Sequence, residues 1–183
     1  DLALKEDSLG SLLPEIEAIV VDEAHQVPEI ARQFFGKTLS SKHLADLIRD
    51  LRCEMSLLGN DDRTLLDMVS LLESENIAMV HQVLAEDLEY EKWLGDRGRP
   101  IIIKLNAILC NLVLTLNKAS SRNEGMKKLA NRTEQIACDF RLLTESSELA
   151  DSLRWVDKAK GSFTIHLSPI DISQTIGRLF SNT

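Results

Sequence analysis

Aliphatic residues recur at steps of three and four through the middle of the chain, which is the spacing of one face of an α-helix. The first such segment begins with serines suited to helix capping and stops at Gly59. Its apolar positions are Leu44, Leu47, Ile48, Leu51, Met55 and Leu58. The pattern predicts four helices, over about residues 41–58, 61–94, 100–119 and 123–148, with the clearest break at GDRGRP, residues 95–100.

Long helices joined by short connections favour an antiparallel bundle over residues 40–150. Aromatic residues make up only 4% of the 183 residues, which suits aliphatic helix seams better than an all-β sandwich. The predicted fold class is therefore mainly α, a helical bundle flanked by a few β-strands.

The strands are expected near the two ends of the chain. The apolar, β-branched run IEAIVV, residues 16–21, is typical of a buried strand in a parallel sheet, and a short helix should begin near Pro28. Toward the other end, the runs 153–157 and 163–167 around a Lys- and Gly-containing turn predict a hairpin. A last helix, with Asp171 as its N-cap, is expected to follow.

The acidic balance limits the partners of this chain. A formal net charge of −8 and a pI of about 5.0 argue against nucleic-acid binding through bulk electrostatics, although a local basic surface remains compatible with them. The apolar stretch after Pro100 is interrupted by Lys104, Asn106 and Asn111, so no membrane span is expected. A cytoplasmic location is predicted.

The three cysteines and the isolated histidines give no metal signature. Cys53, Cys110 and Cys138 are far apart and form no CxxC pair, so we expect buried free thiols on helices. Three of the four histidines, His43, His81 and His166, show no ligand spacing with one another.

The sequence VVDEAH places Asp22, Glu23 and His25 directly after the predicted strand. Side chains at the carboxyl end of a parallel strand project into the crevice where open α/β sheets bind ligands. Nucleotide hydrolysis needs one acidic residue there for Mg²⁺ and a second to activate water. The alternative is that the two acids cap the helix near Pro28 and that His25 is a solvated loop residue.

The stretch LLPEIEAIVVDEAHQVPEIA, residues 12–31, resembles motif II of DinG-type, XPD-like superfamily 2 DNA helicases, especially the DinG/YoaA branch. The tail SFTIHLSPIDISQTIGRLF resembles the segment that precedes motif III in that family. Such helicases insert a mostly helical Arch domain between these landmarks. The resemblance thus implies a motor-domain piece over 1–39, an Arch-like domain over 40–150, and a hairpin and helix returning to the motor domain over 151–183.

For individual residues, the resemblance implies that Asp22 binds Mg²⁺ with ATP, that Glu23 activates water, and that His25 couples nucleotide state to DNA binding. It also implies 5′-to-3′ movement on single-stranded or forked DNA. The chain starts at Asp1 without methionine and contains no GxxxxGK[ST] loop, so we expect a fragment that is inactive alone. An iron–sulfur cluster is possible upstream in this family, and the three cysteines here would not bind it.

Contact between the helical body and a DNA strand would require a basic surface. The candidates are Arg97 and Arg99 in the break, and a second group near the third-to-fourth helix turn: Lys118, Arg122, Lys127, Lys128 and Arg132. Tyr90 and Trp93 are candidates for base stacking. A solvated helix end and a buried Trp93 are the structural alternatives.

Two other functions compete with a helicase. The first is a non-catalytic helical scaffold whose acidic surface binds a protein partner, with no partner identifiable from the sequence. The second is a metal-dependent hydrolase that uses Asp22, Glu23 and His25, which lacks a further ligand cluster at metal spacing.

Overall fold

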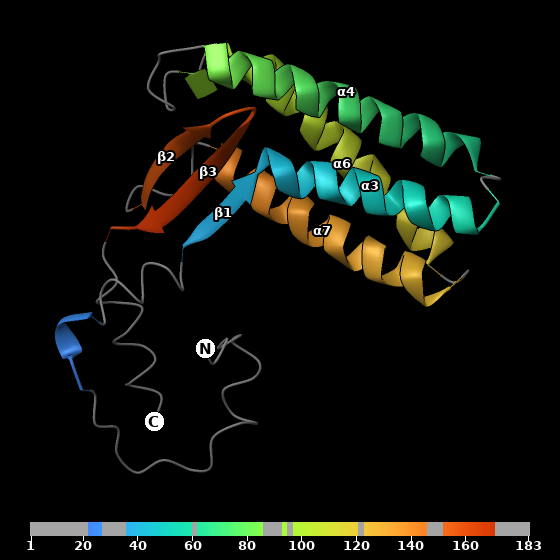
Figure 1. Ribbon diagram of the computed structural model, residues 1–183, viewed down its shortest axis with the longest axis horizontal. Helices are drawn as coiled ribbons and strands as arrows, with labels where there is room; N and C mark the ends of the chain where they lie inside the picture. Colours follow the sequence, from blue (N-terminus) through green and yellow to red (C-terminus); the bar gives the residue numbers. More distant parts are fainter. Residues whose placement is uncertain are drawn as a thin grey trace.

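The structure is a computed structural model that describes residues 22–26, 36–59, 62–85, 93–94, 97–120, 123–145 and 152–170. Within these residues the elements are η1 (Ala24–Gln26), β1 (Lys37–Ser40), α3 (Ser41–Leu57), α4 (Arg63–Ala85), α6 (Arg99–Ala119), α7 (Glu124–Thr144), β2 (Ser152–Ala159) and β3 (Ser162–Pro169). Figure 1 shows a helical bundle with a small sheet against one end. The mainly α fold class is confirmed. The predicted strand at 16–21, the helix near Pro28 and the helix after Asp171 lie outside the described residues.

The four helices run alternately in opposite directions (Figure 1). α3 packs on α4 and α7, and α6 packs on the same two helices, so the four surround one aliphatic core. Leucines on all sides of it are fully buried, among them Leu47, Leu51, Leu72, Leu109 and Leu112. Each such side chain contributes about 1.5–3 kcal/mol through removal from water.

The helix boundaries follow the predicted signals. Ser40 caps α3 by accepting a hydrogen bond from the His43 amide at 3.2 Å, and Gly59 follows the helix with a positive φ of 90°. Asn123 caps α7 in the same way, accepting from the Met126 amide at 2.7 Å. The second predicted helix corresponds to α4, Arg63–Ala85, and residues 86–92 of the predicted span lie outside the described residues.

The sheet has the order β1–β3–β2, with both pairs antiparallel. The predicted hairpin is confirmed as β2 and β3, joined at a two-residue turn in which Gly161 has a φ of 72°. β1 was not predicted from the sequence KTLS, because four residues with one buried apolar side chain, Leu39, show too little alternation. Leu39 lies opposite Ile165 on β3, and both are buried.

A buried polar joint fixes the sheet to the bundle at the start of α3. The Ser41 hydroxyl accepts a hydrogen bond from the Phe163 amide at 3.3 Å, and the Ser41 carbonyl accepts one from Asn76 Nδ2 at 3.2 Å. Asn76 comes from the middle of α4, so strand β3 and helices α3 and α4 meet at one residue. Buried polar groups that are hydrogen-bonded in this way define one arrangement of the surrounding elements.

The expectation of buried thiols was wrong. Cys53 on α3, Cys110 on α6 and Cys138 on α7 are all free and exposed. Each lies in an apolar stretch of sequence, but the rotation of its helix places it on the solvent side. The Leu and Ile residues beside each cysteine in the sequence fill the core instead.

α6 is unusually apolar. In the described part of the chain it is the helix long and apolar enough to cross a membrane by length and composition, with a mean hydropathy of 1.6 over the qualifying window. Leu105, Leu109, Leu112 and Leu116 on α6 are fully buried in the bundle. Core burial accounts for these leucines, whereas Ile103 and Leu114 on the same helix are exposed.

Trp93 belongs to the core, which confirms the structural alternative for this residue and removes it as a base-stacking candidate. Only 3% of Trp93 is exposed, and its carbonyl accepts a hydrogen bond from the Gly98 amide at 2.7 Å. A Cβ atom added at Gly98 would lie 2.7 Å from three atoms of the Trp93 indole. Glycine is therefore required where the break meets the start of α6. Tyr90 lies outside the described residues.

We expect Gly98→Ala to destabilise the chain by about 1–3 kcal/mol, because the added methyl group overpacks the indole. Urea unfolding followed by circular dichroism measures this loss. In a Trp93→Leu background the smaller side chain leaves room for the methyl group, so the cost of Gly98→Ala should shrink. An equal cost in both backgrounds would contradict the contact with the indole.

Candidate functional site

The residues of the DEAH sequence form a tight turn. The Gln26 amide donates a hydrogen bond to the Glu23 carbonyl at 2.8 Å, which closes the 3-10 turn η1. The Glu23 amide donates to Asp22 Oδ1 at 2.9 Å. Glu23 has a φ of 52°, the left-handed conformation that costs a non-glycine residue about 1 kcal/mol. Strain of this kind is often found at functional positions.

The polar side chains of the turn face solvent and one another. Glu23 Oε2 lies 3.1 Å from His25 Nδ1, with 63% and 73% of the two side chains exposed. A pair this exposed contributes little to stability, so its geometry is available for other interactions. Asp22, Glu23 and His25 lie within four consecutive residues, so their proximity follows from the sequence itself.

The two carboxylates fit part of a magnesium site. Asp22 Oδ1 is occupied by the Glu23 amide, which leaves Asp22 Oδ2 and one Glu23 oxygen as hard oxygen donors. Protein Mg²⁺ sites commonly use one or two carboxylates, with waters and substrate phosphates as the remaining ligands. Within the residues that the structure describes, no group of three or more His, Cys, Asp or Glu side chains could hold a metal alone. The donor set fits a nucleotide-bound ion.

The predicted strand before Asp22 falls at residues 16–21, outside the described residues. The position of Asp22 at the end of a sheet strand therefore stays a prediction.

The predicted cations separate into two groups at opposite ends of α6. Arg97 and Arg99 lie at its start, whereas Lys118 lies in its last turn, about 30 Å away for a helix of this length. Lys127 and Lys128 follow Lys118 across the short connection to α7. Arg122 lies outside the described residues.

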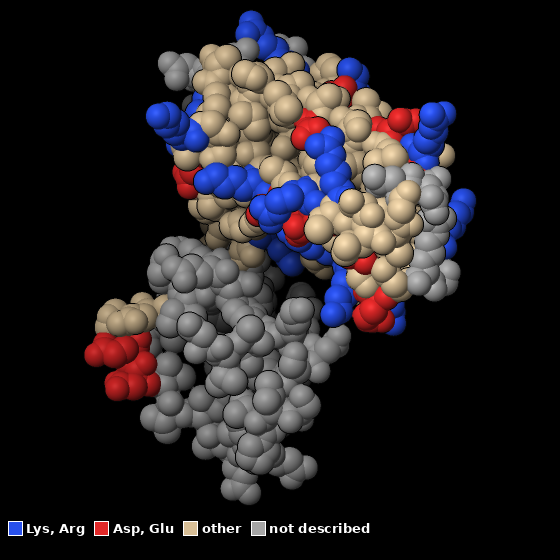
Figure 2. All heavy atoms as spheres, turned by 45° about the vertical axis from the view of Figure 1, so that its right-hand side comes forward, with Lys and Arg blue, Asp and Glu red and all other residues tan. Residues whose placement is uncertain are grey.

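Lysine and arginine side chains are scattered over the face drawn in Figure 2, with acidic side chains between them. The side chains of Lys118, Lys127 and Lys128 are exposed. The three lysines lie at the α6–α7 end of the bundle, where Glu124 and Glu54 also lie, and we call these lysines the basic helix end.

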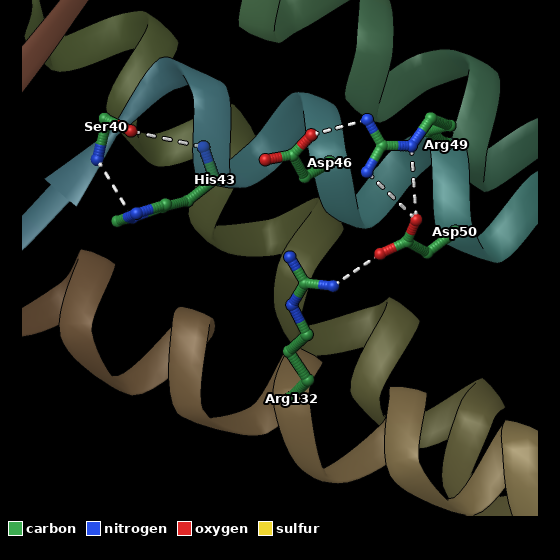
Figure 3. Close-up of polar contacts among 6 residues, drawn as sticks. All are labelled: Ser40, His43, Asp46, Arg49, Asp50 and Arg132. Atoms are coloured by element: carbon green, nitrogen blue, oxygen red, sulfur yellow. Dashed lines mark hydrogen bonds and ion pairs between the residues drawn. The ribbon is translucent and has the colours of Figure 1, made fainter.

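Arg132 makes a contact between helices that the sequence did not reveal. Its Nη1 donates to Asp50 Oδ2 on α3 at 2.6 Å (Figure 3). The other oxygen of Asp50 accepts from Arg49, which also pairs with Asp46 at 2.8 Å. Because Asp50 and Arg132 are separated by 82 positions in the sequence, helical periodicity could not reveal the pair. The Arg132 charge is thereby shared with an α3 carboxylate.

The hydrogen bond from Arg132 is the main reason that the pKa of Asp50 lies below its ordinary value of 3.8. Partial burial opposes this effect, and the hydrogen bond from Arg49 and the charges of both arginines lower the pKa further. Similar contacts join the other helices. Arg52 on α3 binds Glu73 on α4 through two hydrogen bonds of 3.1 and 2.6 Å, and Glu54 accepts from Asn123 at 2.6 Å.

Sequence reasoning treated His166 as isolated, and the structure corrects this. Its ring stacks on Trp155 with centroids 4.8 Å apart and an angle of 6° between the planes. The hairpin offered a usable signal, because a two-residue turn at 160–161 pairs residue 155 with residue 166.

Comparison with known proteins gives two curated relatives, and no protein-family model matches the chain. The chain is 26% identical over 184 residues to the ATP-dependent DNA helicase YoaA of Haemophilus influenzae, covering 97% of this chain and 28% of that protein. It is 49% identical over 51 residues to the ATP-dependent DNA helicase YoaA of Escherichia coli, covering 28% of this chain and 8% of that protein.

These matches confirm the predicted resemblance to the DinG/YoaA branch, since curated homologues with that name cover the chain. The chain spans 28% of the length of the first relative. A match over 97% of the chain necessarily includes residues 22–25, because they lie far from either end.

The lowered pKa of Asp50 predicts a pH-dependent contribution to stability. A carboxyl with a depressed pKa in the folded state stabilises the fold above its unfolded pKa, near 3.8, and loses this effect as the pH falls through the folded value. With 37% of Asp50 exposed, we expect only about 0.5 kcal/mol between wild type and Asp50→Asn at neutral pH. The difference should be constant above about pH 5 and vanish at lower pH.

Urea unfolding of both proteins between pH 2.5 and 7 measures this difference. Asp67→Asn is the matched control, because Asp67 is an exposed aspartate on α4. A difference that stays constant down to pH 2.5 would contradict the role of the Asp50 charge.

Proposed function

We propose that this chain is part of an ATP-dependent DNA helicase of the DinG/YoaA type, which couples ATP hydrolysis to 5′-to-3′ translocation on single-stranded or forked DNA. The observation that carries the proposal is the similarity along 97% of the chain to a curated helicase, which takes in the DEAH sequence. An active-site acid pair and a helical body in one short chain agree with such a motor and its accessory domain.

In this proposal the turn at residues 22–26, which we call the acid turn, would bind the metal and activate the attacking water. Asp22 would hold Mg²⁺ through its carboxylate, and the bound ion would supply positive charge beside the phosphates of ATP. Glu23 orients a water and accepts its proton. His25, 3.1 Å from the Glu23 carboxylate, is placed to couple the state of that carboxylate to a neighbouring segment that contacts DNA.

The helical body would serve as an Arch-like clamp over the strand, with domains at 1–39, 40–150 and 151–183. The pairing of β1 with β3 supports an insertion, because the strand that enters the bundle lies beside the strand that leaves it. An element with adjacent ends can be inserted in a loop of another domain with little distortion. The structure adds that β2 and β3 share a sheet with β1.

We place DNA phosphate contact at the basic helix end, with Arg132 a weaker candidate because it pairs with Asp50. Arg97 and Arg99 would contact the DNA strand at a separate place, because the length of α6 separates them from the basic helix end. An iron–sulfur cluster would belong to the segment before Asp1, and the protein would work in the bacterial cytoplasm.

Replacement of the candidate base tests the catalytic role. In the full-length protein, Glu23→Gln should lower DNA-stimulated ATP hydrolysis by about 10²–10⁴-fold while ATP binding is retained, because the amide cannot accept the proton from water. A coupled phosphate-release assay measures the rate. Glu134→Gln makes the same chemical change at an exposed position on α7 and should leave it unchanged.

The same experiment separates the helicase from the non-catalytic scaffold. Full-length wild-type protein without any DNA-stimulated ATPase activity would favour the scaffold. ATPase activity that survives in Glu23→Gln would leave the motor in place and contradict the role of this residue.

The basic helix end is tested by salt dependence. Lys127→Ala/Lys128→Ala should weaken single-stranded DNA binding by the full-length protein and reduce the slope of log K against log salt by about 1.4, for two lost phosphate contacts. Fluorescence anisotropy between 50 and 200 mM salt, our chosen range, gives the slope. Lys104→Ala is the control, because Lys104 lies 3.6 Å from Glu75. An unchanged slope would place the phosphate contacts elsewhere.

A further inference from the structure

The outer face of the hairpin carries an exposed stacked ring pair. Trp155 on β2 lies directly opposite His166 on β3, and their rings are parallel to within 6° at a centroid distance of 4.8 Å. Trp155 is 38% exposed, whereas Trp93 in the core is 3% exposed. In the described part of the chain, Trp155 is the only aromatic residue among the exposed large hydrophobic ones.

The two faces of the sheet differ in role. Phe163, Ile165 and Leu167 on β3 are buried in the core with the helices. Residues alternate between faces along a strand, so His166 faces outward, and its register partner Trp155 shares that face. The ring pair therefore lies outside the apolar core. An exposed tryptophan forgoes the free energy gained by burial, so its exposure suggests a surface that binds a ligand.

The Trp155 ring is held by its stack on His166. His166 covers one face of the indole, and His166 Nε2 lies 3.0 Å from Asp157 Oδ2. This contact has the distance of an ion pair but lacks the angles of a hydrogen bond. Because His166 lies on the central strand and Trp155 on the next, the second indole face points away from the stack, toward the β2 side. A flat ligand would extend the stack there with little loss of side-chain entropy.

The surroundings of the indole favour a nucleobase as this ligand. Leu153 is 59% exposed two residues earlier on the same face of β2, where it can contact a sugar or a neighbouring base. Lys160 carries positive charge in the turn of the hairpin, whereas Lys158 lies on the opposite face of β2 from Trp155. Asp157 is the acidic group on this face, and it is engaged with His166. A flat aromatic surface beside cations is the arrangement that binds single-stranded nucleic acid.

We propose that an unpaired base of single-stranded DNA stacks on the open face of Trp155. This inference rests on the proposed function, since it assigns a second contact with the same DNA strand. Base–aromatic stacking tolerates every base, so the site would hold the strand without reading its sequence. The basic helix end would supply the salt-dependent part of the affinity and Trp155 a part that depends little on salt.

Single-stranded DNA binding by the full-length protein tests the inference. Trp155→Ala and Trp155→Leu should each weaken binding of a labelled oligo-dT by about tenfold, because both lose the flat ring and Leu keeps the apolar bulk. Trp155→Phe should retain most of the affinity. Leu114→Ala, which shortens an exposed apolar side chain on α6, should bind like wild type. The salt slope should be the same in all four variants.

An abasic oligonucleotide of the same length provides the second measurement. It keeps the phosphates and lacks the bases, so the wild-type protein should bind the abasic oligonucleotide about as weakly as Trp155→Leu binds oligo-dT. Thermal unfolding confirms that each variant is folded. If Trp155→Ala is unfolded, Trp155→Leu decides the outcome.

The possible failures are distinguishable. Wild-type protein without DNA binding or DNA-stimulated ATPase activity would overturn the proposed function and this inference with it. DNA-stimulated activity with all Trp155 variants binding like wild type would overturn only the inference, and loss of a protein partner in those variants would assign the face to protein docking. Equal losses in Trp155→Phe and Trp155→Leu would show that the flat ring is not responsible.

Discussion

The arrangement of this chain depends on the pairing of β1 with β3. Lys37–Ser40 pairs with Thr164–Leu167 across the whole helical body, and it brings the first and last described strands of that body side by side. β1 continues directly into α3, so this pairing also sets where the bundle begins. The Phe163 amide on the Ser41 hydroxyl then joins sheet and bundle at the same point. Together with the burial of Phe163, Ile165 and Leu167 among the helices, this closure fixes the hairpin that carries Trp155 on the bundle.

Within the bundle, aliphatic burial supplies the stability and polar contacts select the arrangement. Asp50 with Arg132 joins α3 to α7, and Arg52 with Glu73 joins α3 to α4. Each pair is partly exposed and contributes little free energy, yet each is satisfied in only one alignment of its two helices. Charged residues that look like a DNA-binding surface in the sequence therefore include some that hold the bundle together. The lysines at the basic helix end remain available for phosphate contact.

The helices and the hairpin could be predicted from local patterns, because leucine spacing, caps at Ser40 and Asn123, and the turn at Gly161 act over a few residues. β1 could not, since its four residues become a strand only through a partner more than a hundred positions away. The exposure of Cys53, Cys110 and Cys138 depends on the exact rotation of each helix, which periodicity places only within a residue or so. Of the candidate site, the proximity of Asp22, Glu23 and His25 follows from their adjacency. The partner of Arg132 depends on tertiary packing.

The proposed function joins these parts into a motor element and an accessory that guides the strand. The acid turn would act at the nucleotide, and the helical body would contact the DNA at the basic helix end and at Trp155. The most direct test is strand displacement by the full-length protein on a forked duplex with a free 5′ tail. The account predicts unwinding with ATP and Mg²⁺ and none with a non-hydrolysable ATP analogue. A folded protein that neither hydrolyses ATP nor separates the strands would contradict it.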